Sequence, residues 1–357
     1  MPKAPGEVTH AEIFQQPELW PDTARRVRAA GLDPPARPVI TGAGTSSFAA
    51  LAVEAGWPGA RVAPSTELFL DFAKVLPEAG AVLSLARSGD SPESTAVVER
   101  IQRALPRVRH VAITCNAEGR LARWPGVETI VLDARTNDRS LVMTSSFSNL
   151  VLAGLALARA DEVAAALPGM CAGWDRLLPL LDDKAKALAA SPPARLVTLA
   201  SGPLLGAARE AWLKVLEMTA GRVATLAETY LGVRHGPMSF LEPDTLVVCF
   251  LSSDPARRRY ESDLVRELRA KKLGRPVAVG QPETDSHLFE AVITTPASAL
   301  PDWLRTPGEI VFAQLLGYHL SLRLGLDPDS PSPGRVITRV VEGVRIYPEE
   351  SGPSREE

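Results

Sequence analysis

Residues 81–94 read AVLSLARSGDSPES, and this stretch decides the fold class of the chain. The six residues Ala81–Ala86 are almost all apolar, which predicts a strand that is buried on both faces. The turn that follows carries Gly89, and Pro92 suits the first position of a helix, which we expect over Ser91–Leu105. A buried strand that passes through a short turn into a helix is the building unit of a parallel α/β sheet.

The same alternation of strands and helices extends along the whole chain. We expect strands at Val39–Gly44, His110–Cys115, Glu128–Leu132, Arg195–Ala200, Thr245–Leu251, Pro276–Gly280 and Ala291–Thr295, and helices at Ser46–Ala55, Ser145–Ala158, Leu204–Ala220, Arg257–Lys272 and Glu309–Leu324. The stretch Asp161–Ala190 is rich in Ala and Leu, and we expect it to be helical throughout and to connect two halves of the chain.

The two halves repeat one design. VITGAG at 39–44 aligns with VTLASG at 197–202, an offset of 158 residues. LSLARSGD at 83–90 aligns with VCFLSSDP at 248–255, an offset of 165 residues. Nearly equal offsets over two separate elements indicate a duplicated α/β domain.

Composition limits the class of function. The chain has 357 residues, 45% of them hydrophobic and 23% charged, which indicates a globular protein of two domains. A net charge of −3 does not suggest binding to nucleic acid, which needs an excess of positive charge. The sequence contains no run of about 18 apolar residues, so we expect no membrane span. The three cysteines form no C-x-x-C, and the N-terminus lacks the apolar core of a signal peptide. We therefore expect a cytoplasmic protein without a disulfide framework or a metal site.

Two turns form a candidate phosphate site at the carboxyl ends of neighbouring strands. The turn at 86–94 offers the hydroxyls of Ser88, Ser91 and Ser94, the charge of Arg87 and the N–H groups of a helix start. The alternative is that Ser91 only caps that helix. The other turn, GAGTSS at 42–47, is no dinucleotide fingerprint, because serine replaces the third glycine of that motif.

A third serine-rich turn, Thr144-Ser145-Ser146, precedes a helix and would add a wall to the same site. The turn SSDP at 252–255 is the counterpart in the second half, but it lacks the glycine and contains Asp254. We therefore expect one phosphate site per chain, in the first half.

Two places in the second half are candidates for proton transfer. Lys214 and Glu217 share one face of a helix, although a solvent-exposed ion pair has the same spacing. His235 lies in GVRHGP at 232–237, where glycine and proline predict a loop. An imidazole there can move protons near neutral pH, but an exposed histidine without a role fits the pattern as well.

These motifs together resemble sugar isomerase (SIS) domain proteins. The resemblance is carried by GAGTS at 42–46, RSGDSPES at 87–94, MTSS at 143–146, KVLEMTAG at 214–221 and RHGP at 234–237, in the order of that family. The chain is most similar to the subfamily of tagatose-6-phosphate ketose/aldose isomerases, which are also described as galactosamine-6-phosphate deaminases. Its second half is similar to the isomerase half of glucosamine-6-phosphate synthase.

The resemblance implies two tandem SIS domains, each a flavodoxin-like three-layer αβα sandwich around a parallel sheet. We place an N-terminal helical arm at 1–30, the first domain at 31–165, a connecting helix at 166–194, the second domain at 195–345 and a C-terminal tail at 346–357. The family also implies a homodimer whose active site lies at the subunit interface.

The same resemblance gives each candidate residue a role. Glu217 matches the base that moves a proton between C1 and C2, and His235 matches a histidine of the neighbouring subunit that opens the sugar ring. Lys214 would steady the developing oxyanion. Phosphate ligands are expected at Ser46, Arg87, Ser88, Ser91 and Ser145, and other substrate contacts at Gly44, Thr45 and Arg234.

The implied reaction converts galactosamine or glucosamine 6-phosphate into a ketose 6-phosphate and ammonia, with no metal or organic cofactor. A plain aldose–ketose isomerase or a fructosamine-phosphate deglycase would use the same Glu217 and His235, so the sequence leaves both open. A non-catalytic sugar-phosphate sensor would need neither residue, and the presence of both favours an enzyme. The sequence does not fix the epimer at C4.

Overall fold

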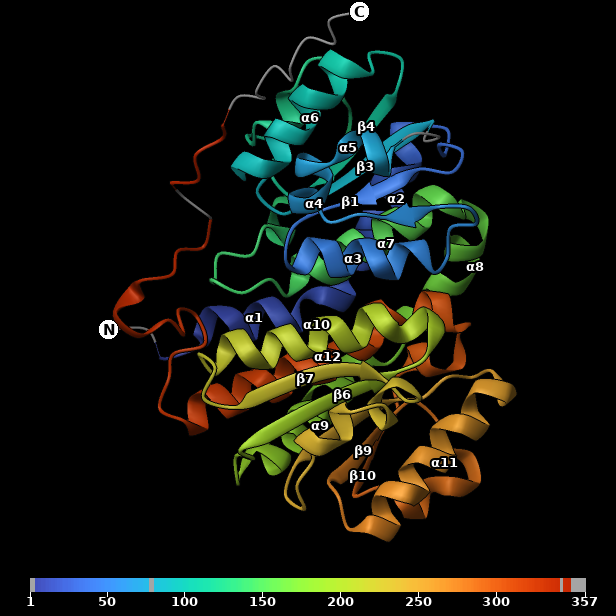
Figure 1. Cartoon of the computed structure of the whole chain (residues 1–357), viewed down its shortest axis with the longest axis vertical. Helices are drawn as coiled ribbons and strands as arrows, with labels where there is room; N and C mark the ends of the chain where they lie inside the picture. The colour runs from blue at the N-terminus through green and yellow to red at the C-terminus, as the bar shows by residue number, and fades with distance from the viewer. Residues whose placement is uncertain (1–3, 77–79, 341–342, 348–357) are drawn as a thin grey trace, which may run out of the picture.

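The computed structural model describes residues 4–76, 80–340 and 343–347 of the chain. The first of its two parallel sheets has the strand order β2-β1-β3-β4-β5 (Figure 1). These strands span Val39–Thr41 (β1), Arg61–Val62 (β2), Ala81–Ala86 (β3), Arg109–Thr114 (β4) and Glu128–Val131 (β5). All six residues of β3 are buried, because helices cover both faces of the sheet.

The second sheet repeats this topology. Its strands span Arg195–Ala200 (β6), Ala224–Thr229 (β7), Leu246–Phe250 (β8), Arg275–Val279 (β9) and Ala291–Ile293 (β10). From its β7 edge the order is β7-β6-β8-β9-β10, which is the connectivity of the first sheet. Both sheets therefore have the flavodoxin-like order 2-1-3-4-5, and the predicted fold class with its duplication is confirmed.

The helices form the layers around these sheets. They span Glu7–Phe14 (α1), Gln16–Ala30 (α2), Thr45–Glu54 (α3), Ser65–Leu70 (α4), Phe72–Val75 (α5), Pro92–Ala104 (α6), Ser145–Ala158 (α7), Ala160–Cys171 (α8), Trp174–Ala189 (α9), Leu205–Met218 (α10), Pro255–Lys271 (α11) and Asp302–Arg323 (α12). None of the helices in the described parts of the chain is long and apolar enough to cross a membrane.

A shared helical layer joins the two halves. In Figure 1, α3 and α7 of the first half lie next to α10 and α12 of the second, and α6 and α11 cover the outer faces. One buried apolar cluster runs through this layer. Helix α10 crosses α3 so closely that a Cβ on Gly206 would lie only 2.8 Å from Ala52, and glycine makes this approach possible. This approach places the second half's α10 beside the carboxyl end of β1.

The N-terminal helix α1 is tied to the chain far from it in sequence. Its first turn donates backbone N–H groups of Val8 and Thr9 to the carboxylate of Asp329, at 3.1 and 2.7 Å. Glu12 of the same helix is buried and accepts a 2.6 Å hydrogen bond from the N–H of Arg139. The arm thus braces the loop before α7 and the segment that follows α12.

Several element predictions need correction. The range Asp161–Ala190 is two helices, because Gly173 adopts a left-handed φ of 74° between α8 and α9. Helix α12 begins at Asp302 rather than Glu309 and continues through Pro307. Strands β2 and β7 and helices α4 and α5 were not expected, because none carries a long periodic apolar pattern.

Candidate active site

A cleft at the carboxyl ends of β1 and β3 collects most of the predicted site residues. Its volume is about 270 Å³. The predicted residues that line it are Gly44, Thr45, Ser46, Arg87, Ser88, Ser91 and Glu217. The first six come from the first half and Glu217 comes from α10, so the cleft lies where the two halves meet.

Two helix starts open into this cleft. Helix α3 begins after Gly44, whose φ of 55° is a left-handed value that favours glycine, and α6 begins after Ser91. Within the described residues, no side chain caps either helix start. Both therefore direct the positive end of a helix dipole toward the cleft, which favours an anion.

Hydroxyl groups surround these helix starts. Ser46 is nearly buried in α3, whereas Ser88 and Ser91 are half-buried on the neighbouring turn. The hydroxyl of Ser91 donates to that of Ser94 at 2.6 Å. Because a phosphate dianion only accepts hydrogen bonds, the Ser91 hydroxyl would bind it by turning away from Ser94 and donating to a phosphate oxygen. Gly89 has a φ of 70° and shapes the turn between Ser88 and Ser91. The arrangement has the chemistry of a phosphate site.

Arg87 lies in the wall of the cleft but is held by backbone carbonyls. Its guanidinium donates to the carbonyl oxygens of Leu141 at 3.1 Å and of Arg339 at 2.6 Å. The side chain is 8% exposed, and no carboxylate among the described residues hydrogen-bonds to it. Burial, with the nearby charge of Arg339, lowers the pKa of Arg87. A largely buried cation without a carboxylate partner adds a positive field for a dianionic ligand.

One face of α10 carries three charged side chains that meet at the floor of the cleft. The Nζ atom of Lys214 lies 2.6 Å from Oε2 of Glu217 and 3.4 Å from Oε1 of Glu210. It also donates to Oγ1 of Thr45, in α3, at 3.1 Å. Lys214 and Glu210 are fully buried, whereas 31% of the Glu217 side chain is exposed. Glu217 is thus the one member of this trio that faces the cleft.

The geometry changes what Lys214 can do. Lys214 is fully buried, donates hydrogen bonds to Thr45 and Glu217, and forms an ion pair with Glu210, so its ammonium is directed at groups of the chain itself. Burial acts to lower the pKa of Lys214, but the carboxylates of Glu210 and Glu217 outweigh it and raise the pKa. The ammonium therefore stays charged and fixes the Glu217 carboxylate.

Glu210 is a functional candidate that the sequence analysis missed. Burial raises its pKa to about 8, against the lowering effect of Lys214. Its Oε1 accepts from the Thr45 hydroxyl at 3.3 Å, whereas its Oε2 is buried without a partner among the described residues. The signal was present in the sequence, because Glu210 lies four residues before Lys214 and therefore on the same helix face.

Ser145 does not reach the cleft. Asp138 caps the start of α7 and accepts the N–H groups of Thr144, Ser145 and Ser146 at 2.8, 3.1 and 2.9 Å. The Ser145 hydroxyl donates to the carbonyl oxygen of Glu12 at 2.6 Å, and the side chain is fully buried. A carboxylate of the chain already occupies this helix start, and Ser145 does not line the cleft that holds the other predicted phosphate ligands.

His235 and Arg234 also lie outside the cleft. Both follow β7 in a loop of the second half, and His235 is exposed. The Nε atom of Arg234 donates to Glu267 of α11 at 2.7 Å, so its guanidinium is held on the outer helix. Neither residue lines the cleft that contains Glu217. Within one chain, the structure does not bring the predicted base and the predicted ring-opening histidine together.

The segment 337–340 forms a wall of the cleft that was not predicted. It contributes Ile337, Thr338, Arg339 and Val340. The Arg339 side chain donates to the carbonyl oxygen of Asp138 at 2.6 Å, while its own carbonyl accepts from Arg87. The C-terminal segment is thus fastened at the cleft by hydrogen bonds from both directions.

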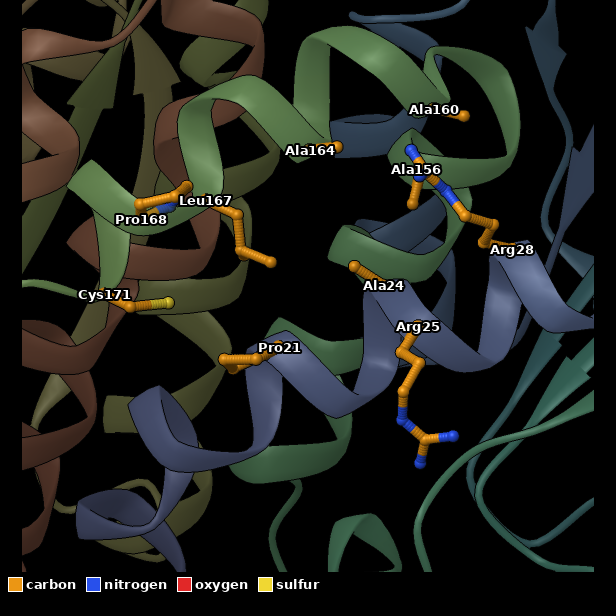
Figure 2. A pocket seen from close by; sticks show the side chains of 10 residues that line it. All are labelled: Pro21, Ala24, Arg25, Arg28, Ala156, Ala160, Ala164, Leu167, Pro168 and Cys171. Atoms are coloured by element: carbon orange, nitrogen blue, oxygen red, sulfur yellow. The ribbon is translucent and has the colours of Figure 1, made fainter.

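A second cavity, of about 380 Å³, lies between α2 and α8 (Figure 2). Its walls are mainly alanine, leucine and proline side chains, with Cys171 at one end and Arg25 and Arg28 on the α2 side. The described residues that line it include no carboxylate, imidazole or hydroxyl side chain for proton transfer. In the part of the chain that the structure describes, no three His, Cys, Asp or Glu side chains are grouped as metal ligands would be.

Known proteins share this architecture and sequence. The D-galactosamine-6-phosphate deaminase AgaS of Escherichia coli is 34% identical and covers 97% of both chains. The protein of that name from Shewanella sp. (strain ANA-3) is 34% identical over 95% of this chain and 92% of its own. The crystal structure of tagatose-6-phosphate ketose/aldose isomerase from Escherichia coli superimposes with a TM-score of 0.80 and 31% identity, and covers 98% of this chain and 99% of that chain. The chain matches no family model.

Proposed function

Because this chain belongs to the family of SIS-domain sugar-phosphate isomerases and deaminases, we propose that it deaminates galactosamine 6-phosphate. The products are the ketose tagatose 6-phosphate and ammonia, with water as the second substrate. One observation carries the proposal: Glu217 faces the same cleft as the two open helix starts and their serines. A sugar phosphate bound there would present its carbon chain to a carboxylate.

The phosphate is proposed to bind at the starts of α3 and α6. The contacts are the hydroxyls of Ser46, Ser88 and Ser91, with Arg87 adding positive charge from the wall. This end of the substrate takes no part in bond breaking. Its binding energy instead positions C1 and C2, which is how remote contacts raise turnover.

Glu217 is the proposed base. In the open-chain aldehyde, the hydrogen on C2 is acidic, and the carboxylate removes it to give an enolamine. The same carboxyl group then returns the proton to C1, which leaves an imine at C2. Lys214 is a positioning residue in this scheme, because it is fully buried and holds Oε2 of Glu217 at 2.6 Å. Water adds to the imine carbon, and loss of ammonia gives the ketone.

Ring opening requires a group that can both donate and accept a proton, and no imidazole is found among the described residues that line the cleft. We propose that His235 of a second copy supplies it, so that the active form is a homodimer. The exposure of His235 supports this proposal, as does the exposed Leu231 (48%) in the same loop. An imidazole that is accessible on one chain is available to a cleft on another.

A coupled assay tests the proposed reaction. Ammonia release is measured from galactosamine 6-phosphate and glucosamine 6-phosphate, and ketose formation is measured from galactose 6-phosphate. We expect ammonia from the galacto epimer at a higher kcat/KM than from the gluco epimer. Interconversion of the neutral aldose and ketose phosphates without ammonia release from either amino sugar would instead identify a plain isomerase.

A further inference from the structure

The turn after β8 is the counterpart of the proposed phosphate turn after β3. Ser252 and Ser253 follow β8 as Arg87 and Ser88 follow β3, and α11 begins after this turn as α6 does after the other. The sheets around them have the same strand order. The chain therefore contains two turns of the same build in equivalent places.

The donors of this second turn converge on one carboxylate, that of Asp302. The N–H and the hydroxyl of Ser253 both donate to its Oδ1, each at 2.8 Å. The hydroxyl of Ser252 donates to its Oδ2, and Arg305 donates to Oδ1 at 2.8 Å. Asp302 is 6% exposed and Arg305 is 1% exposed. One backbone amide, two hydroxyls and one guanidinium are a typical set of ligands for a small oxyanion.

Two further carboxylates accept hydrogen bonds from the remaining N–H donors around this turn. The N–H of Ser252 donates to Oε2 of Glu261 at 2.9 Å. The start of α11 is capped by Asp254, which accepts the N–H of Ala256 at 2.8 Å. In the first half, by contrast, α6 has no side-chain cap among the described residues. The first residue of α7 is Ser145, which carries no carboxylate where α12 has Asp302.

We infer that the second half holds an anion cradle of the same build as the proposed substrate cradle, and that the carboxylate of Asp302 is its built-in anion. Without that carboxylate, the cradle would take a small free oxyanion such as phosphate or formate. The comparison with the first half uses only its strand order and the place of its turn, and the contacts to Asp302 lie in the second half, so the inference does not depend on the proposed reaction. It gives a physical reason why a phosphate would bind in one half only.

The occupied cradle has a structural use. Asp302 and Arg305 belong to α12, so their contacts fasten this helix to the second sheet. Helix α12 packs closely on α10, because a Cβ on Gly317 would lie 3.4 Å from the carbonyl oxygen of Lys214. In the first half, the turn after β3 thus stays open for a ligand. In the second half, the turn after β8 binds Asp302 and so holds α12, the helix that packs against α10 at Lys214.

Chemical rescue of Asp302→Gly tests this inference. The full chain is heated in chloride, formate or phosphate at equal ionic strength, and Tm is followed by circular dichroism. We expect a lower Tm for the variant in chloride, and a saturable recovery of about 5 °C in formate and phosphate beyond their effect on wild type. The matched control is Asp182→Gly, which removes a carboxylate whose partners are His10 and His319, with no backbone N–H partner among the described residues.

The control is expected to lose stability and to respond to the anions as wild type does. A Tm of Asp302→Gly that responds to phosphate and formate no more than wild type and the control would overturn the inference. Should the variant fail to fold in chloride, refolding from denaturant in phosphate is expected to recover its native signal. Equal failure in chloride and phosphate would also overturn it.

Discussion

The ammonium of Lys214 donates a 3.1 Å hydrogen bond to the hydroxyl of Thr45, and this contact joins the two halves at the cleft. Thr45 is the first residue of α3, one of the two helix starts in the proposed phosphate site. Lys214 holds Glu217, the proposed base. The proposed phosphate site and the proposed base are therefore joined by a buried contact. The sequence analysis assigned Thr45 to substrate contact and Lys214 to the oxyanion, and it did not predict that the two side chains meet.

Replacing Thr45 tests this connection. Thr45→Val keeps the shape of the side chain but removes the hydrogen bonds to Lys214 and Glu210. We expect kcat to fall by about 10-fold, in line with a buried charged group that loses a partner, while KM changes little. Thr41→Val is the matched control, since the Thr41 hydroxyl is buried without a partner in the described part of the chain. Equal effects of the two variants on kcat would refute a positioning role.

Removing serine hydroxyls tests the phosphate site. Ser88→Ala and Ser91→Ala should each raise KM by about 10-fold, because each removes a charge-assisted contact to phosphate. Ser145→Ala should lower Tm but leave KM unchanged, since its hydroxyl donates to the Glu12 carbonyl. Steady-state kinetics and thermal melts measure both quantities. A raised KM in Ser145→Ala, with a wild-type KM in Ser88→Ala and Ser91→Ala, would instead indicate that phosphate binds at the start of α7.

Mixing two inactive variants tests the proposed homodimer. A dimer that pairs Glu217→Gln with His235→Ala has one site with both residues intact if His235 acts across the interface. Full subunit exchange should then restore about one quarter of wild-type activity, since half of the dimers are mixed and each has one intact site. No recovery, with exchange shown by mass spectrometry of tagged chains, would place each site within one chain.

A buried histidine of β4 predicts how stability depends on pH. Burial lowers the pKa of His110 to about 4, from an ordinary value near 6.5. The unfolded chain therefore binds a proton that the folded chain does not, and stability should fall as the pH drops from about 6.5 to 4. Across this range of pH, protonation of His110 in the unfolded chain lowers the free energy of unfolding by about 3 kcal/mol.

His110→Gln keeps a hydrogen-bonding group beside Ser84, which lies 2.8 Å from the His110 ring, but it does not titrate in this range. Urea unfolding across this pH range should show a shallower pH dependence for the variant than for wild type. The same slope in both proteins would mean that other groups cause the acid instability.

The sequence predicted the parts of the fold that repeat a simple pattern. Buried runs such as Ala81–Ala86 and Arg195–Ala200 are apolar and bounded by turns, so periodicity identifies them. Strand β2 has only two residues, and β7 is mostly half-buried and mixes apolar with polar side chains without a regular alternation, so neither pattern was distinctive. The domain limits at 31–165 and 195–345, the homodimer and the cytoplasmic location stay predictions.

The candidate site was predictable in part. Parallel strands bring the turns at 42–47 and 86–94 to one edge, and topology alone places them together. The sequence could not show that Ser145 lies outside the cleft, because a helix start in sequence does not reveal which carboxylate caps it, and here Asp138 does. The wall at 337–340 depends on a chain path that local sequence does not encode. The approach of Glu217 to the first half came only from the family resemblance.

The central claim is that Glu217 removes the hydrogen from C2 of the bound sugar. Glu217→Gln preserves the size of the side chain but cannot accept that proton, so the variant should fold and bind substrate. Exchange of the C2 hydrogen with solvent deuterium, followed by NMR, should slow by at least about 100-fold relative to wild type. Exchange at the wild-type rate in the folded variant would contradict the claim, because another group would then be the base.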